Sequence, residues 1–188
     1  ADLPIFKIEE ILLNYAECKF EQAQFSQDVA DKTINKLRDR VGVARMVVSE
    51  INDSFDPNRG TDDSGKKIDP VLWEIRRERT IELMGEGFGF YDVRRWKCAK
   101  WYVNRQQTGI WIDDSCKDLD GNSDYIAKYQ TVNPSSKAPQ TGPGHIYRYP
   151  DPVTSGYGLL DKYYLYCLPT DEIALNPNLN QNPGWAVE

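Results

Sequence analysis

The chain has 188 residues, a formal net charge of −6 and a hydrophobic content of 40%, which together allow one domain with a packed core. The negative charge argues against nucleic acid, which binds to basic surfaces, and against peripheral binding to anionic lipid. No apolar run approaches the length that a membrane span requires.

Residues 5–20 are predicted to form an amphipathic helix. The apolar residues of this segment recur at helical spacing: Ile8, Ile11, Leu12, Tyr15 and Cys18. Glu10, Asn14 and Glu17 fall on the opposite face. We therefore expect the apolar face of this helix to point into the core.

A second helix is predicted over residues 26–40. Ser26 can cap its beginning, and Gly42 is a suitable stop. The two helices have the length of one tetratricopeptide-like helix–turn–helix, and no second copy of that unit is visible in the chain.

A polar linker over residues 55–67 separates this pair from the next helices. Asp69 and Pro70 provide an N-cap followed by proline at the first helical position, so a helix should run from there to about residue 84. Glycines at alternate positions then break it. An aromatic-rich helix is expected over residues 88–101, with apolar side chains on nearly all sides.

Residues 106–158 show no sustained periodicity. They are rich in Asp, Asn, Ser and Pro, which favour turns. We predict a long, irregular, loop-rich excursion, with short strands at residues 110–112 and 163–166.

The cysteines and the single histidine form no metal-binding or catalytic motif. Cys18 and Cys167 lie among apolar neighbours and are expected to be small core residues. A Cys98–Cys116 bridge is an alternative in an oxidising compartment. His145 has no second histidine or carboxylate at metal-ligand spacing, so we expect it in a solvated loop.

A set of charged residues lies on or near the helix that begins at Asp69. Arg79 and Glu82 are three residues apart, so their side chains can meet. The whole set is Arg76, Arg79, Glu82, Asp92, Arg94 and Arg95. An anion or substrate site is one interpretation. We predict instead a structural ion network that locks two helices together, since a buried charge must be paired.

Residues 118–124 resemble the start of a calcium-binding loop. The oxygen-bearing residues alternate along it: Asp118, Asp120, Asn122 and Asp124. The pattern departs from an EF-hand at Ser123, where glycine is required, and at Tyr129, where glutamate is required. We expect a polar turn and no cofactor, with a calcium site of another type as the alternative.

Three blocks of the chain resemble the SusD/RagB family. The last is YYLYCLPTDEIALNPNLNQNPGW at residues 163–185, and the second is IRRERTIELMGEGFGFYDVRRW at residues 75–96. The first, PIFKIEEILLNYAE at residues 4–17, is similar to a family helix that usually carries Arg at the position of Lys7 and Ala at that of Glu9. The blocks occur in the family's order.

The resemblance implies a mostly α fold, with tetratricopeptide-like helical pairs, a long irregular loop-rich excursion and short strands. The parts of this SusD-like C-terminal domain would be a helix pair (1–42), signature helices (69–104), the loop-rich excursion (105–160) and a C-terminal hook (161–188). Family members are considerably longer than this chain. We therefore expect the N-terminal half of the protein, with its lipid anchor, to precede these residues.

The function implied by the resemblance is non-catalytic capture of a nutrient, most often an oligosaccharide, by a lipoprotein on the outer membrane. The nutrient would pass to a SusC-like TonB-dependent transporter, and no enzyme activity is expected. Two alternatives stay open. One is a helical-repeat scaffold that binds protein, and the other is a peptide- or glycoprotein-binding member of the same family.

Aromatic residues of the excursion are the candidates for sugar binding. Sugar rings stack on aromatic planes, and their hydroxyls bond to Asn, Asp, Gln and Arg side chains. The predicted glycan-binding residues are Trp111, Asp113, Asp114, Tyr147, Arg148 and Tyr149. A plain core role is the alternative for these aromatics. Trp96 and Trp185 lie in the family blocks, and Trp73 lies just before the second of them; all three are expected in the core.

Overall fold

The computed structural model describes residues 6–105, 108–122, 129–132, 139–140, 142–147, 156 and 158–185. The chain divides into two compact units, Ala1–Ala99 and Lys100–Glu188. The described residues are mostly helical, with a few short strands in one small sheet, which confirms the predicted fold class. None of the helices in these ranges combines the length and apolarity that a membrane crossing requires.

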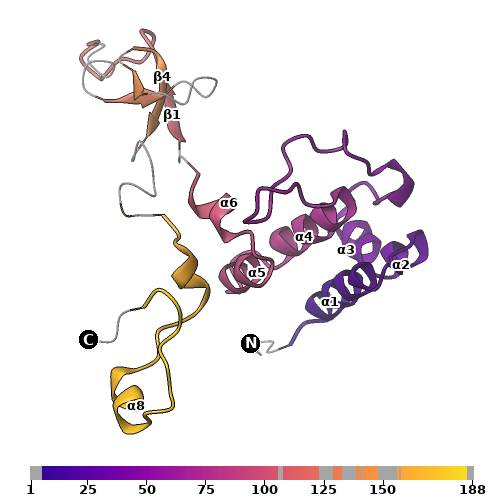
Figure 1. Cartoon of the computed structure of the whole chain (residues 1–188). Coiled ribbons are helices and arrows are strands. Elements are labelled where there is room, and N and C mark those ends of the chain that lie inside the picture. The colour runs from indigo at the N-terminus through magenta and orange to yellow at the C-terminus, as the bar shows by residue number, and fades with distance from the viewer. Residues whose placement is uncertain are drawn as a thin grey trace, which may run out of the picture. The chain divides into compact units, whose positions relative to one another are not determined.

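The first unit is built from short helices around one apolar core (Figure 1). Its elements are α1 (Ile8–Glu21), α2 (Gln27–Lys32), α3 (Ile34–Val41), the 3₁₀ turn η1 (Val48–Glu50), α4 (Pro70–Glu82) and α5 (Gly89–Arg95). α1 lies against α4, and α2 and α3 pack on α1. The core side chains are Leu13, Ala16, Ala30, Ile34, Leu37, Met46, Ile51, Ile75 and Leu83.

Three predicted helix ends are confirmed. The Ser26 hydroxyl accepts a hydrogen bond from the N–H of Val29 at 3.4 Å. The Asp69 carboxylate accepts from two N–H groups in the first turn of α4, at 2.9 and 3.2 Å. Gly42 ends α3 with φ at 71°, a left-handed conformation that glycine adopts without strain.

The helix predicted over residues 26–40 is interrupted at Thr33. This residue ends α2 and begins α3 with φ −123° and ψ −93°, and its hydroxyl donates to the Val29 carbonyl at 2.6 Å. The break lets the flanking residues Ala30 and Ile34 both reach the core.

The predicted core-facing side of α1 is wrong. Ile8 and Ile11 are exposed, whereas Leu13 and Ala16 are fully buried. Glu17, which we placed on the polar face, is also buried. It can be buried because an arginine and an indole from the chain near α5 satisfy its carboxylate.

The aromatic-rich helix predicted over residues 88–101 is two helices, α5 and α6 (Ala99–Val103). Lys97 separates them with φ at 52°, outside the right-handed helical region. The N–H of Cys98 then bonds to the Val93 carbonyl at 3.1 Å, which turns the chain sharply.

All four cysteines are free thiols. Cys98 is buried in the first unit, but Cys18 and Cys167 are exposed, so the core placement that we predicted for these two is wrong. The alternative bridge between Cys98 and Cys116 is not formed.

The excursion carries a four-stranded antiparallel sheet that the sequence did not indicate as a whole. Its strands are β1 (Thr108–Ile112), β2 (Thr131–Val132), β3 (Pro139–Gln140) and β4 (Gly144–Tyr147), in the order β1-β4-β2-β3. The strand predicted at residues 110–112 is confirmed within β1. Gly144 is needed for the β2–β4 approach, since a Cβ there would lie 3.0 Å from the Thr131 side chain.

The strand predicted at residues 163–166 is wrong. The structure has a 3₁₀ turn, η2 (Asp161–Tyr164), in which the N–H groups of Tyr163 and Leu165 bond to carbonyls close before them. The last helix, α8 (Thr170–Leu175), follows.

The Asn- and Pro-rich tail is held by side-chain hydrogen bonds. The Trp185 indole donates to the Lys162 and Leu165 carbonyls at 3.0 and 3.2 Å. The Gln181 side chain bonds to both backbone groups of Leu168, at 2.8 and 2.9 Å. The tail therefore closes as a hook.

Candidate functional site

Trp111 on β1 presents a partly exposed indole. Trp111 as a whole residue is 41% exposed. Its ring meets the His145 ring edge-on, with 5.2 Å between the ring centroids. His145 is the cross-strand partner of Trp111 on β4. The histidine ring is fixed in turn by a 2.9 Å hydrogen bond between its Nδ1 and the Gly109 carbonyl. The sheet therefore holds this indole in one orientation while leaving it accessible.

Asp113 lies beside the Trp111 indole and orients it. Its Oδ2 accepts a hydrogen bond from Trp111 Nε1 at 3.1 Å, and its Oδ1 accepts from the N–H and hydroxyl of Ser115 at 2.9 and 2.5 Å. The Ser115 hydroxyl and N–H, with the indole N–H, hold the pKa of the Asp113 carboxyl below its usual value. Asp113 is therefore an acceptor that keeps its charge at neutral pH.

The other predicted glycan residues are placed only in part. Asp114 is exposed next to Asp113. Tyr147 pairs through its backbone with Thr108 at the end of the sheet. Arg148 and Tyr149 lie outside the described residues. The structure thus brings Trp111, Asp113 and His145 together, and the last of these was predicted only as a loop histidine.

The described part of the calcium candidate, residues 118–122, is a turn held by hydrogen bonds among its own residues. Asp118 Oδ1 accepts from the N–H groups of Asp120 and Asn122 at 2.9 and 2.8 Å. The Asn122 N–H bond, with others in the turn, lowers the pKa of Asp118. Asp124 lies outside the described residues. Within the described part of the chain, no three His, Cys, Asp or Glu side chains are grouped as metal ligands.

The predicted pair of Arg79 and Glu82 does not form. Arg79 Nε instead bonds to Asp92 Oδ2 of α5 at 2.7 Å, and its Nη1 donates to Asn14 of α1 at 2.8 Å. Glu82 bonds to Arg40 at 2.7 Å, on the surface. The helical wheel put Arg79 and Glu82 on one arc, but each side chain finds its partner on another helix.

Arg79 belongs to a larger cluster, which we call the interhelical ion network, because it joins α1, α4 and α5. Its members are Glu17, Arg76, Arg79, Asp92 and Arg95. Arg95 bonds to both acids, and Trp96 Nε1 donates to Glu17 at 2.6 Å. Arg94, the remaining predicted member, lies over the Phe90 ring at 5.1 Å. That the role of this network is structural stays a prediction.

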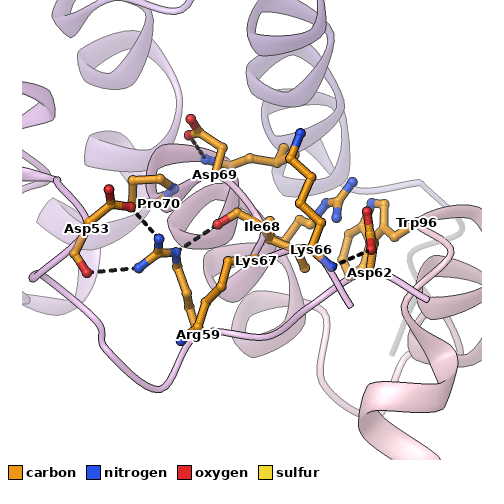
Figure 2. A pocket seen from close by; sticks show the side chains of 11 residues that line it. Asp53, Arg59, Asp62, Lys66, Lys67, Ile68, Asp69, Pro70 and Trp96 are labelled. Carbon is orange, nitrogen blue, oxygen red and sulfur yellow. Dashed lines mark hydrogen bonds and ion pairs between the residues drawn. The ribbon is translucent and has the colours of Figure 1, made fainter. Parts of the chain in front are cut away.

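A pocket of about 460 Å³ lies between the loop that precedes α4 and the start of that helix (Figure 2). Such a volume is within the range of small-molecule sites, roughly 300–1,000 Å³. Its basic lining residues are Arg59, Lys66, Lys67 and Arg76, and its acidic ones are Asp53, Asp62 and Asp69. Ile68, Pro70, Leu72 and Trp96 provide the apolar wall.

Arg59 fixes the loop that forms one side of the pocket. Its guanidinium donates to the Ile68 and Asp53 carbonyls, both at 2.8 Å, and forms an ion pair with the Asp53 carboxylate. Figure 2 shows these bonds crossing from one arm of the loop to the other. We predicted this segment as a plain polar linker, since nothing in its sequence marked Arg59 as buried.

Two comparisons with known proteins gave no match and one gave a family. No curated protein and no solved structure matches the chain. The model of the SusD family matches residues 1–185. A match over nearly the whole chain confirms the resemblance in the three sequence blocks, and it supports nutrient or glycan binding in general.

Proposed function

The chain belongs to the SusD family, and from this premise we propose that it captures a carbohydrate nutrient without any covalent chemistry. Proteins of this family bind nutrients and are not catalysts. For this chain the ligand class that we propose is an oligosaccharide.

The observation that carries the proposal is the oriented, accessible indole of Trp111. A sugar ring can stack on such a plane, and a rigid aromatic loses little conformational entropy when it binds. Asp113 lies 3.1 Å from the indole nitrogen and has a low pKa, so it offers a charged acceptor next to the stacking face. One apolar plane with one adjacent acceptor matches a sugar, which has both C–H faces and hydroxyl donors.

Delivery and location follow from the family and are part of the proposal. We propose that the protein is a lipid-anchored protein on the outer membrane and that it passes its ligand to a SusC-like TonB-dependent transporter. The formal charge of −6 is compatible with a neutral or weakly charged ligand reached at the cell surface.

A binding panel tests this function against its alternatives. The intact protein would be applied to an array that carries neutral and acidic oligosaccharides, peptides and glycopeptides. Saturable binding to oligosaccharides is the expected result. Binding to peptides alone would favour the peptide-binding alternative, and capture of folded protein with no binding on the array would favour the scaffold.

A further inference from the structure

Two of the cationic residues that line the pocket, Arg76 and Lys66, have a nitrogen donor without a hydrogen-bond partner among the described residues. The Arg76 guanidinium lies over the Trp96 ring at 4.9 Å, and its Nε is buried without a hydrogen-bond partner. The nearest carboxylate oxygen, on Glu17, is 3.9 Å from that nitrogen, beyond hydrogen-bond reach. Lys66 also lines the pocket, and its Nζ makes no hydrogen bond within the described residues.

The interhelical ion network has one more positive charge than negative, and Arg76 is the arginine without a bonded acid. The network has three arginines and two acids, and the two acids are bonded to the other two arginines. Glu21 also acts on Arg76, but it is exposed and screened by water. Burial lowers the pKa of the Arg76 guanidinium by more than the nearby Glu17 carboxylate raises it.

The acids of the pocket already have partners and are not free to neutralise those cations. Asp53 is paired with Arg59, and Asp69 caps α4. Asp62 accepts hydrogen bonds within its own turn, from the Ser64 hydroxyl, the Ser64 N–H and a third N–H. A carboxylate has about four acceptor positions, so these groups can still accept from hydroxyls. Three negative charges also disfavour a multiply charged ligand such as phosphate.

We propose that this pocket is a second binding site, which takes a monoanionic hydroxy-carboxylate such as a uronic acid. The ligand's carboxylate would accept from Arg76 and Lys66, and its hydroxyls would donate to Asp62 and Asp69. The pocket residues all belong to the first unit, whereas Trp111 belongs to the second.

Titration of the chain by two-dimensional NMR tests this site. Sodium glucuronate should shift the indole N–H of Trp96 and the amides of residues 62–69, with saturation. Glucose, which has the hydroxyls without the carboxylate, should leave these signals in place. Inorganic phosphate, which carries more negative charge and is repelled by the three acids of the pocket, should bind at least about tenfold more weakly. Equal shifts with glucose, or equal affinity for phosphate, would overturn the assignment.

Two substitutions locate the binding in the pocket. Lys66→Gln, in an exposed loop, should weaken glucuronate about tenfold without changing the fold, and Arg76→Gln should abolish binding. Lys36→Gln, on an exposed position of α3, removes the same charge outside the pocket and should change nothing. If Arg76→Gln unfolds the protein, Lys66→Gln decides. Unchanged affinity in that variant would refute the site.

Discussion

Arg79 and Asp92 form a buried ion pair, with 2.7 Å between Nε and Oδ2, that joins α4 to α5. Both side chains are at most 7% exposed. The Asn14 amide oxygen adds a third helix to the same guanidinium. Because every charge in this contact has a partner, it can exist away from water.

Asp92→Asn should destabilise the first unit by about 3–5 kcal/mol, because it leaves Arg79 buried without its counter-ion. Urea unfolding followed by circular dichroism measures the loss. Arg40→Ala breaks ion pairs to Glu9 and Glu82 at the surface, where Arg40 is half exposed, and should cost far less. An equal loss of unfolding free energy in the two variants would mean that the buried pair stabilises the unit no more than the surface pairs do.

Gly184→Ala should loosen the C-terminal hook. The residue has φ +83°, and a Cβ there would lie 2.9 Å from the Cβ of Lys162, whose carbonyl holds Trp185. Gly121→Ala is the matched control, because it has the same φ and open space around it. Both variants carry the backbone strain of a left-handed residue, about 1–2 kcal/mol. Only Gly184→Ala should also speed proteolysis of the tail, and equal cleavage of both would show that the contact is unimportant.

Cys98 should resist alkylation at pH 8. Burial raises the pKa of its thiol to about 11, so almost no reactive thiolate forms, whereas Cys18 is exposed to the reagent. Mass spectrometry after iodoacetamide treatment should find Cys18 modified and Cys98 intact, with both modified in denaturant. Since the folded state favours the protonated thiol, its contribution to stability is present below the unfolded pKa of about 8.5 and is lost as pH rises through 11. Rapid modification of native Cys98 would contradict this placement.

Local sequence signals predicted where helices begin and end. These signals act through hydrogen bonds or backbone angles within a few residues, so their roles follow from spacing alone. They are Asp69 with Pro70, Ser26 and Gly42. The break at Lys97 could not be predicted in this way, because lysine has no preference for a positive φ and the Lys97 carbonyl accepts from the N–H of Asp63, which is distant in the sequence.

Partners across helices could not be read from the sequence. The helical wheel placed Arg79 on the apolar side of α4. It could not identify the partner of Arg79, because Asp92 lies thirteen residues further along the chain in another helix. The same holds for α1, whose buried face contains Glu17 because Arg95 comes from α5. At the candidate site, Trp111 and Asp113 are two residues apart and were predicted together, whereas His145 joined them only through strand pairing.

The most direct test of the central claim is the affinity of a Trp111→Ala variant of the intact protein for the oligosaccharide that the binding panel selects. Removal of the stacking plane should weaken binding at least about tenfold, or about 1.4 kcal/mol. Because the indole is 41% exposed, the melting temperature should hardly change. Ile110→Ala removes an apolar side chain, 72% exposed, from the neighbouring strand position and leaves the Trp111 indole in place, so this variant should keep full affinity.

Isothermal titration of these two variants beside the wild type gives the answer. The account predicts lost affinity and unchanged melting for Trp111→Ala, with neither change for Ile110→Ala. Full oligosaccharide affinity in Trp111→Ala, together with a large fall in its melting temperature, would show that the indole only packs the sheet and would contradict the account.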